Sequence, residues 1–100
     1  RVRVMAETVA VRVVIRGRVQ GVWFRAWTEN VARDLCLDGW VRNRSDGTVE
    51  AVFAGPTPVI DRMINNCREG PPAADVESVT EERIEADPLI GIGFSKKPTA

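Results

Sequence analysis

The stretch that decides the fold is TVAVRVVIRGRVQGVWFRAWTENVARDL, residues 8–35. Over residues 8–16 every second residue from Val9 onward is apolar, which predicts a strand with one buried face. From Phe24 to Leu35 the apolar residues recur at helical spacing instead. The chain therefore begins with a strand, a loop that contains glycine, and a helix.

A hairpin is predicted after this first helix. We expect Gly39 to end the helix. Residues 40–44 and 48–54 then read as two short strands, with Val49, Ala51 and Phe53 on one face of the second. Asp46-Gly47 lies between them and favours a tight turn, because both residues tolerate positive φ.

A second helix and two further strands complete the pattern. Thr57 is the expected N-cap, Pro58 the first helical residue, and Gly70 the end of the helix. Residues 76–85, rich in glutamate, predict a fourth strand, and a short edge strand is expected near residues 92–95.

The order β-α-β-β-α-β predicts an α+β, ferredoxin-like sandwich. In this fold a four-stranded antiparallel sheet, here in the order 4-1-3-2, carries both helices on one face. A length of 100 residues allows one hydrophobic core. We expect residues 1–7 to form a flexible N-terminal tail and residues 8–100 a single domain.

Composition excludes several classes of function. Lys+Arg and Asp+Glu both number 14, and this balance argues against a nucleic-acid partner. No apolar run approaches the roughly 20 residues of a membrane span, and no signal peptide is visible. Histidine is absent, and Cys36 and Cys67 lack metal-ligand spacing, so no metal or other cofactor is expected. We expect a cytoplasmic monomer with two reduced cysteines on buried helix faces.

The loop GRVQGVWFR, residues 17–25, is the candidate site. It lies between a strand end and a helix start, where free backbone N–H groups and the positive end of the helix dipole meet. Gly17 and Gly21 let the backbone bend, and Arg25 offers a planar fork of donors to phosphate oxygens. These features suit a tetrahedral oxyanion. An ordinary β–α connection with a surface arginine has the same spacing, so spacing alone leaves both interpretations open.

A second phosphate motif is disfavoured. Cys36 to Arg42 fits Cys-x5-Arg, the pattern of phosphatases that form a phosphocysteine. That motif needs a strand, then the loop, then a helix. Here Cys36 ends a helix and Arg42 lies in the next strand, so the order is reversed and no cradle forms.

Four segments together resemble the acylphosphatase family: GRVQGVWFR (17–25), GWVRN (39–43), DGTVE (46–50) and GPPAADVESV (70–79). The resemblance covers residues 8–85, approximately. It implies the ferredoxin-like fold and metal-independent hydrolysis of the carboxyl–phosphate bond of acyl phosphates, so the expected partners are an acyl phosphate and inorganic phosphate.

The site residues follow from the resemblance by position. The phosphate-binding loop of the family falls on Arg18, Val19, Gln20, Gly21, Val22, Trp23, Phe24 and Arg25. The catalytic arginine of the family falls on Arg25 and its water-orienting asparagine on Asn43. Many members have Thr or Ser after that asparagine, whereas this chain has Arg44, so a hydroxyl near the water is lost. Trp23 and Phe24 are expected to pack under the loop as core; a substrate contact of Trp23 is the less favoured alternative.

This chemistry explains why a hydrolase can lack histidine. The leaving group is a carboxylate, whose parent acid has a pKa of about 4, so it needs no general acid. Phosphoryl transfer is mainly a problem of position and charge. Backbone N–H groups and Arg25 can hold the phosphate oxygens, Asn43 can hold the water, and the proton of that water can pass to the phosphate itself.

Two other classes of protein share part of this pattern. One is a non-catalytic module that binds acyl or carbamoyl phosphate, similar to the first domain of hydrogenase-maturation carbamoyltransferases. Against it, the chain ends at residue 100 without a following Cys-x-x-Cys finger. The other is an RNA-binding ferredoxin-like domain. Such a domain carries an excess of basic residues and aromatic side chains on its strands for base stacking, and this chain lacks both.

Overall fold

The first strand, β1 (Thr8–Arg18), lies inside the sheet, between β3 and β4. Val9, Val13 and Ile15 are buried as predicted, but Ala10 and Val14 of the opposite face are buried as well, so the strand does not have a single buried face. The structure is a computed structural model that describes residues 7–100, so the N-terminal tail expected over residues 1–7 lies outside the described residues apart from Glu7. The further elements are α1 (Phe24–Asp34), β2 (Asp38–Asn43), β3 (Val49–Pro56), α2 (Thr57–Glu69), β4 (Asp75–Ile84), the 3₁₀ helix η1 (Asp87–Leu89) and β5 (Phe94–Lys96).

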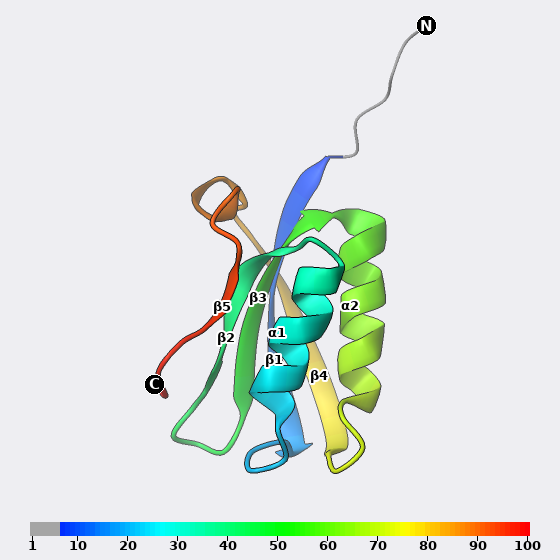
Figure 1. Cartoon of the computed structure of the whole chain (residues 1–100), viewed down its shortest axis with the longest axis vertical. Helices are drawn as coiled ribbons and strands as arrows, with labels where there is room; N and C mark the ends of the chain where they lie inside the picture. The colour runs from blue at the N-terminus through cyan, green and yellow to red at the C-terminus, as the bar shows by residue number, and fades with distance from the viewer. Residues whose placement is uncertain (1–6) are drawn as a thin grey trace, which may run out of the picture.

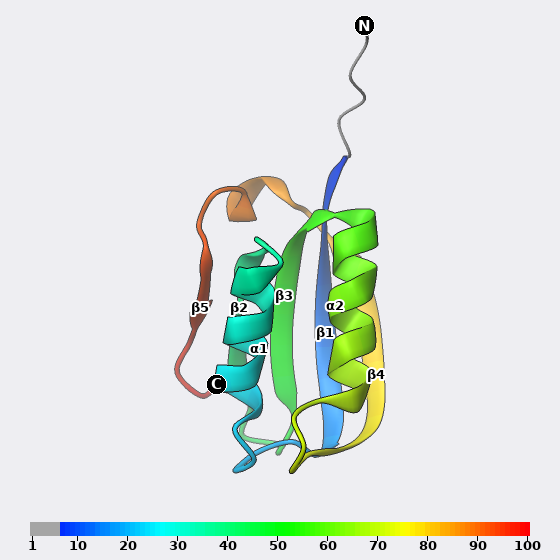
Figure 2. The ribbon, with the colours of Figure 1, turned by 45° about the vertical axis from the view of Figure 1, so that its right-hand side comes forward.

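The sheet has the order β4-β1-β3-β2-β5. The pairs β1/β3, β1/β4 and β2/β3 are antiparallel, which confirms the predicted order 4-1-3-2. β5 is an additional strand that pairs with β2 in parallel. Figures 1 and 2 show α1 and α2 side by side on one face of the sheet, as a ferredoxin-like fold requires. Over residues 7–100 no helix has both the length and the apolar character of a membrane span.

The main core lies between the helices and the sheet. Its largest fully buried side chains include Phe24 of α1, Ile60 and Met63 of α2, and Phe53 of β3. Phe53 stacks on Phe94 of β5 with ring centroids 5.5 Å apart, which fixes the extra strand to the core. Burial of one such side chain stabilises a fold by roughly 1.5–3 kcal/mol.

The strand β3 is buried on both faces. Val49, Ala51 and Phe53 face the helices as predicted. On the other face Val52 packs with residues that include Leu89 of η1, because the chain after β4 folds back over this end of the sheet. Glu50 is also buried there.

Glu50 is held by two arginines. Its carboxylate pairs with Arg12 and, at 2.6 Å, with the Nε of Arg42. Burial alone would raise the pKa of Glu50, but hydrogen bonds from Arg42 and Arg12 hold that pKa below its ordinary value. This face of the sheet therefore carries an ion-pair network beside the small apolar cluster around Val52 and Leu89.

The end of α1 differs from the prediction. The helix stops at Asp34, and the chain turns at Cys36, which has φ 57°. Gly39 does not end the helix. It lies in β2 with φ 136°, where an added Cβ would come within 1.8 Å of the carbonyl oxygen of Val52. Glycine is needed there for the close approach of β3.

The hairpin loop also differs in detail. The N–H of Arg44 donates to the carbonyl of Thr48 at 2.9 Å, so the loop has three residues, 45–47. Gly47 has φ 92°, whereas Asp46 does not adopt positive φ. Asp46 instead accepts hydrogen bonds from the N–H and hydroxyl of Thr48. The turn is thus a three-residue hairpin loop with a left-handed glycine, one of the common alternatives to the two-residue turn.

The remaining boundaries lie within two residues of those predicted. The N-cap of α2 is Pro56 and not Thr57, and no side chain caps it. Gly70, with φ 70°, is the C-cap, as predicted. The predicted strands at residues 76–85 and 92–95 correspond to β4 and β5.

Candidate active site

The loop between β1 and α1 contains two left-handed residues. Gly21 has φ 74° and Trp23 has φ 67°. Val22 lies between them without a positive φ, so the sign of φ alternates over residues 21–23. Alternation of this kind lets successive backbone N–H groups converge on one anion.

The start of α1 leaves these N–H groups available. Its N-cap is Trp23, which offers no side-chain oxygen, and the first turn contains no acidic residue. Within the described chain, the N–H groups of residues 21–25 donate to no protein acceptor. Most helices satisfy such donors with Ser, Thr, Asp or Asn at the N-cap. Here the donors and the positive end of the helix dipole remain open to an anionic ligand.

Gln20 fixes the loop to the β2–β3 hairpin. Its side-chain nitrogen donates to the carbonyl oxygens of Arg44 and Thr48, at 2.8 Å each. These two residues also pair with each other at the base of the hairpin loop. Asn43 directly precedes this pair, so Gln20 sets the position of the loop relative to Asn43.

Asn43 is the last residue of β2. Its strand partner is Val49, and its carbonyl accepts the N–H of Ala100 at 3.0 Å. The backbone of Asn43 is therefore held on both sides, by β3 and by the C-terminal segment. Its side chain is left to face the loop.

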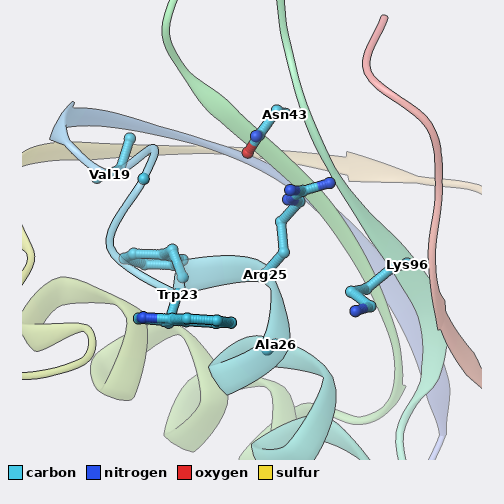
Figure 3. A pocket seen from close by; sticks show the side chains of 8 residues that line it. Val19, Trp23, Arg25, Ala26, Asn43 and Lys96 are labelled. Carbon is cyan, nitrogen blue, oxygen red and sulfur yellow. The ribbon is translucent and has the colours of Figure 1, made fainter.

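A pocket of about 320 Å³ lies where the loop, α1, β2 and β5 meet. Figure 3 shows Arg25 and Asn43 pointing toward one another, with Lys96 entering from β5. Among residues 7–100, no carboxylate lies within ion-pair distance of Arg25. The pocket is lined by Val19, Gly21, Trp23, Phe24, Arg25, Ala26, Asn43 and Lys96.

The structure brings most of the predicted site residues to this pocket, but not all. Both proposed catalytic residues line it, as do Val19, Gly21, Trp23 and Phe24. The side chain of Arg18 is exposed at the end of β1, that of Val22 is buried in the core, and that of Gln20 binds the hairpin. Arg18, Gln20 and Val22 could contribute to phosphate binding only through the backbone or from the rim of the site.

Trp23 does not pack as core. It is 82% exposed, because its left-handed backbone turns the indole outward, whereas Phe24 is buried as predicted. The indole forms an outer wall of the pocket, which supports the alternative of a substrate contact.

Lys96 was not found from the sequence. It lies just beyond the predicted edge strand, and only the pairing of β5 with β2 brings it beside α1. The sequence near residue 96 does not show which strand this segment pairs with, and so does not show that Lys96 lies near Arg25.

The cysteines do not form a phosphatase site. Cys36 is exposed, contrary to the expected burial, because it forms the turn after α1. Arg42 is bound to Glu50 on the open face of the sheet. Cys67 is buried, and burial raises the pKa of its thiol to about 12, so it stays protonated at neutral pH. The part of the chain that the structure describes holds no group of three His, Cys, Asp or Glu side chains placed to bind a metal ion.

A family model described as Acylphosphatase matches residues 11–95, from β1 into β5. The chain belongs to the acylphosphatase family. An acylphosphatase from Rhizorhabdus wittichii is 50% identical over 93 residues, which span 93% of this chain and 92% of that protein. The family and this coverage identify the chain as a hydrolase of the acylphosphatase type.

Solved structures of acylphosphatases share the fold. That of the Coxiella burnetii acylphosphatase has a TM-score of 0.84 at 36% identity, covering 90% of this chain and 93% of that one. Full-length HypF in a phosphate- and nucleotide-bound form has a TM-score of 0.85 at 28% identity, covering 99% of this chain but 13% of that one. The fold thus occurs both as a free acylphosphatase and as a small part of a much larger protein.

Proposed function

We propose that the chain hydrolyses the carboxyl–phosphate bond of acyl phosphates without a metal ion. The observation that carries this proposal is the convergence of Arg25 and Asn43, from different elements, in one pocket (Figure 3). The residues that line this pocket include two cations and no carboxylate. Such a site suits a phosphate group and offers none of the carboxylate ligands that Mg²⁺ prefers.

The phosphoryl group binds between the loop and Arg25. The open N–H groups of residues 21–25 and the positive end of α1 stabilise its oxygens. The guanidinium of Arg25 adds two parallel hydrogen bonds to the same group. Because charge on the equatorial oxygens changes during transfer, donors fixed in advance stabilise the transition state without reorganising. Arg18, Val19, Gln20, Gly21, Val22, Trp23 and Phe24 form the rest of this phosphate loop.

Asn43 orients the attacking water. It faces Arg25 across the pocket, so a water bound to its side-chain amide approaches the phosphate from the β2 side (Figure 3). The amide oxygen accepts a hydrogen bond from the water, which turns a lone pair of the water oxygen toward the phosphorus. The loss of the hydroxyl that many relatives carry at position 44 leaves this task to Asn43 and the solvent.

The step needs no acid or base from the protein. The water oxygen bonds to phosphorus, and the bond from phosphorus to the acyl oxygen breaks, with its electron pair leaving on the carboxylate. One proton of the water passes to a phosphoryl oxygen, so RCO–OPO₃²⁻ and H₂O give RCOO⁻ and H₂PO₄⁻. The carboxylate is a weak base, with a parent-acid pKa of about 4, and leaves unprotonated.

Release of inorganic phosphate from acetyl phosphate in excess chelator tests the proposal, with phenyl phosphate as the control. We expect hydrolysis of acetyl phosphate to persist and phenyl phosphate to react poorly, because its leaving group is more basic. Loss of activity on chelation, with recovery on adding Mg²⁺, would contradict the metal-free step. Phosphate binding without any turnover would instead favour the non-catalytic binding module.

We also propose a monomer that acts in the cytoplasm and binds no nucleic acid. The edge strand β4 carries Glu77, Glu81 and Glu82 on exposed positions, and such charges oppose edge-to-edge pairing. Cys36 and Cys67 are both free thiols, as is usual in a reducing compartment. Light scattering after gel filtration tests the monomer. A mass near that of the single chain, 11.0 kDa, is expected, and about twice that mass would contradict a monomer.

A further inference from the structure

We propose that Lys96 selects acyl phosphates whose acyl group carries a second carboxylate. The inference rests on the proposed function and concerns the same pocket. It assigns the acyl end of the pocket to Lys96, whereas Arg25 and the loop serve the phosphate.

The strand β5 places Lys96 on the face of the sheet that carries the helices. Phe94 is buried against Phe53 in the core between helices and sheet. Side chains alternate along a strand, so Lys96 points to the same face as Phe94. Lys97 points to the opposite face, with its nitrogen 4.7 Å from the ring centre of Trp40. Two adjacent lysines therefore have different environments, and only Lys96 lines the pocket.

The charge of Lys96 is not used by the protein. Within residues 7–100 it forms no ion pair, and no acidic residue lines the pocket. Arg25, the open N–H groups and the helix dipole already face the phosphate. Lys96 adds a positive charge to a site whose other positive groups already face the phosphate, so it favours a ligand that carries a second anionic group.

The direction of the reaction places the acyl group near Lys96. In phosphoryl transfer the attacking and leaving oxygens are roughly in line on opposite sides of phosphorus. Figure 3 shows Asn43 and Lys96 on opposite sides of the Arg25 guanidinium. We place the phosphorus beside this guanidinium and the water on Asn43, so that the leaving acyl group extends toward Lys96. Apart from Arg25, Lys96 and Asn43, the residues that line the pocket are Gly21 and apolar side chains, so Lys96 is the charged group that remains for the acyl group.

The expected effect is modest because Lys96 is exposed. An ion pair at a solvated site changes affinity by up to about fivefold. Salt screens such a pair, with a Debye length of about 10 Å at 0.1 M and about 3 Å at 1 M. A preference of this origin must therefore shrink as the salt concentration rises.

The experiment compares kcat/KM for the monophosphate of succinic acid and for butyryl phosphate, after subtraction of spontaneous hydrolysis. Both acyl groups have four carbons, and only the first carries a second carboxylate. We expect Lys96→Gln to lower kcat/KM for the succinyl substrate about three- to fivefold and to change the butyryl value less than twofold. Lys97→Gln is the matched control and should change neither value. Lys96→Arg should keep the preference, which should also weaken in 0.5 M NaCl.

The two possible failures are distinguishable. Wild-type protein that hydrolyses neither substrate overturns the proposed function and this inference with it. Turnover of both substrates with an equal loss in Lys96→Gln shows that Lys96 contacts the phosphate, which overturns the inference alone. An unchanged succinyl-to-butyryl ratio in Lys96→Gln, or an equal change in Lys97→Gln, overturns it as well.

Discussion

Removal of the Gln20 side chain should uncouple the phosphate loop from the hairpin. Gln20→Ala deletes two hydrogen bonds of 2.8 Å, to the carbonyls of Arg44 and Thr48. Each such bond contributes about 0.5–1.5 kcal/mol to stability, so the free energy of unfolding should fall by about 1–3 kcal/mol. For a domain of this size, a loss of 1 kcal/mol lowers Tm by about 4–8 °C.

The activity of Gln20→Ala should fall as well, although its side chain does not line the pocket. The tether sets the distance between the loop and Asn43, and a displacement of about 1 Å in such a site can cost a hundredfold in rate. We expect kcat to fall at least tenfold while the folded protein keeps its secondary structure. Urea unfolding and steady-state kinetics on acetyl phosphate, at a temperature where the variant is folded, measure both effects.

A matched control separates stability from geometry. Cys67→Ser places a hydroxyl on the buried face of α2, away from the loop. This variant should be less stable than the wild type but keep its kcat. If Gln20→Ala unfolds at the wild-type urea concentration and turns over at the wild-type rate, Gln20 is no tether. If it loses stability but keeps kcat, as Cys67→Ser should, the hairpin does not position the loop for catalysis.

Two further predictions concern stability. Gly17→Ala should lower the free energy of unfolding in urea by more than about 2 kcal/mol, because φ is 124° and the new Cβ would lie 2.2 Å from the carbonyl oxygen of Asp75. Gly47 has φ 92° but open space around it, so Gly47→Ala should cost less. Equal losses in the two variants would refute the steric argument. Glu50 has a lowered pKa when folded, so its contribution to stability is present above about pH 4.5 and is lost as the pH falls through that folded pKa. Glu50→Gln should therefore lower the Tm at pH 7 and flatten the fall of Tm below pH 4.5; a parallel fall in both proteins would contradict this.

The fold could be predicted because its determinants are local. Alternation over β1 and helical spacing over α1 identify the residues that face the helix–sheet core, although β1 is also partly buried on its other face. Gly70 ends α2 because its left-handed φ costs glycine little. The fifth strand was expected only as a short edge strand, since its pairing with β2 depends on a long-range contact, the stacking of Phe94 on Phe53.

The errors arose where tertiary structure overrides residue type. Trp23 was expected in the core because large aromatic residues are usually buried. Its left-handed φ of 67° at the N-cap turns it into solvent instead. Cys36 adopts φ 57°, a conformation expected of glycine, while Gly39 is required by the approach of Val52. No local pattern in the sequence shows that Cys36 makes the turn after the helix or that Gly39 is needed for a strand contact.

The sequence alone predicted only those site residues that lie close together along the chain. Arg25 and Gly21 belong to a single strand–loop–helix unit, so their proximity follows from local structure. Asn43 came from the family resemblance, because its approach to Arg25 depends on the pairing of β2 with β3. Neither local sequence nor the family resemblance pointed to Lys96, because only the pairing of β5 with β2 brings it to the pocket.

Two residues share the work of the proposed site. We propose that Arg25 binds the phosphate in the ground state and the transition state, whereas Asn43 acts on the water and affects only the chemical step. Loss of a fixed donor to a developing oxyanion costs about 3 kcal/mol, or a hundredfold in rate. Arg25→Lys should rescue little, because an ammonium group cannot form the planar fork.

The most direct test is an NMR titration of inorganic phosphate into Arg25→Ala and Asn43→Ala, read beside kcat for acetyl phosphate on the same samples. We predict that Arg25→Ala loses both phosphate affinity and kcat/KM, with a loss of about a hundredfold in kcat/KM. We predict that Asn43→Ala keeps the wild-type Kd for phosphate and loses kcat. Normal phosphate binding by Arg25→Ala, or wild-type kcat in folded Asn43→Ala, would contradict these two roles.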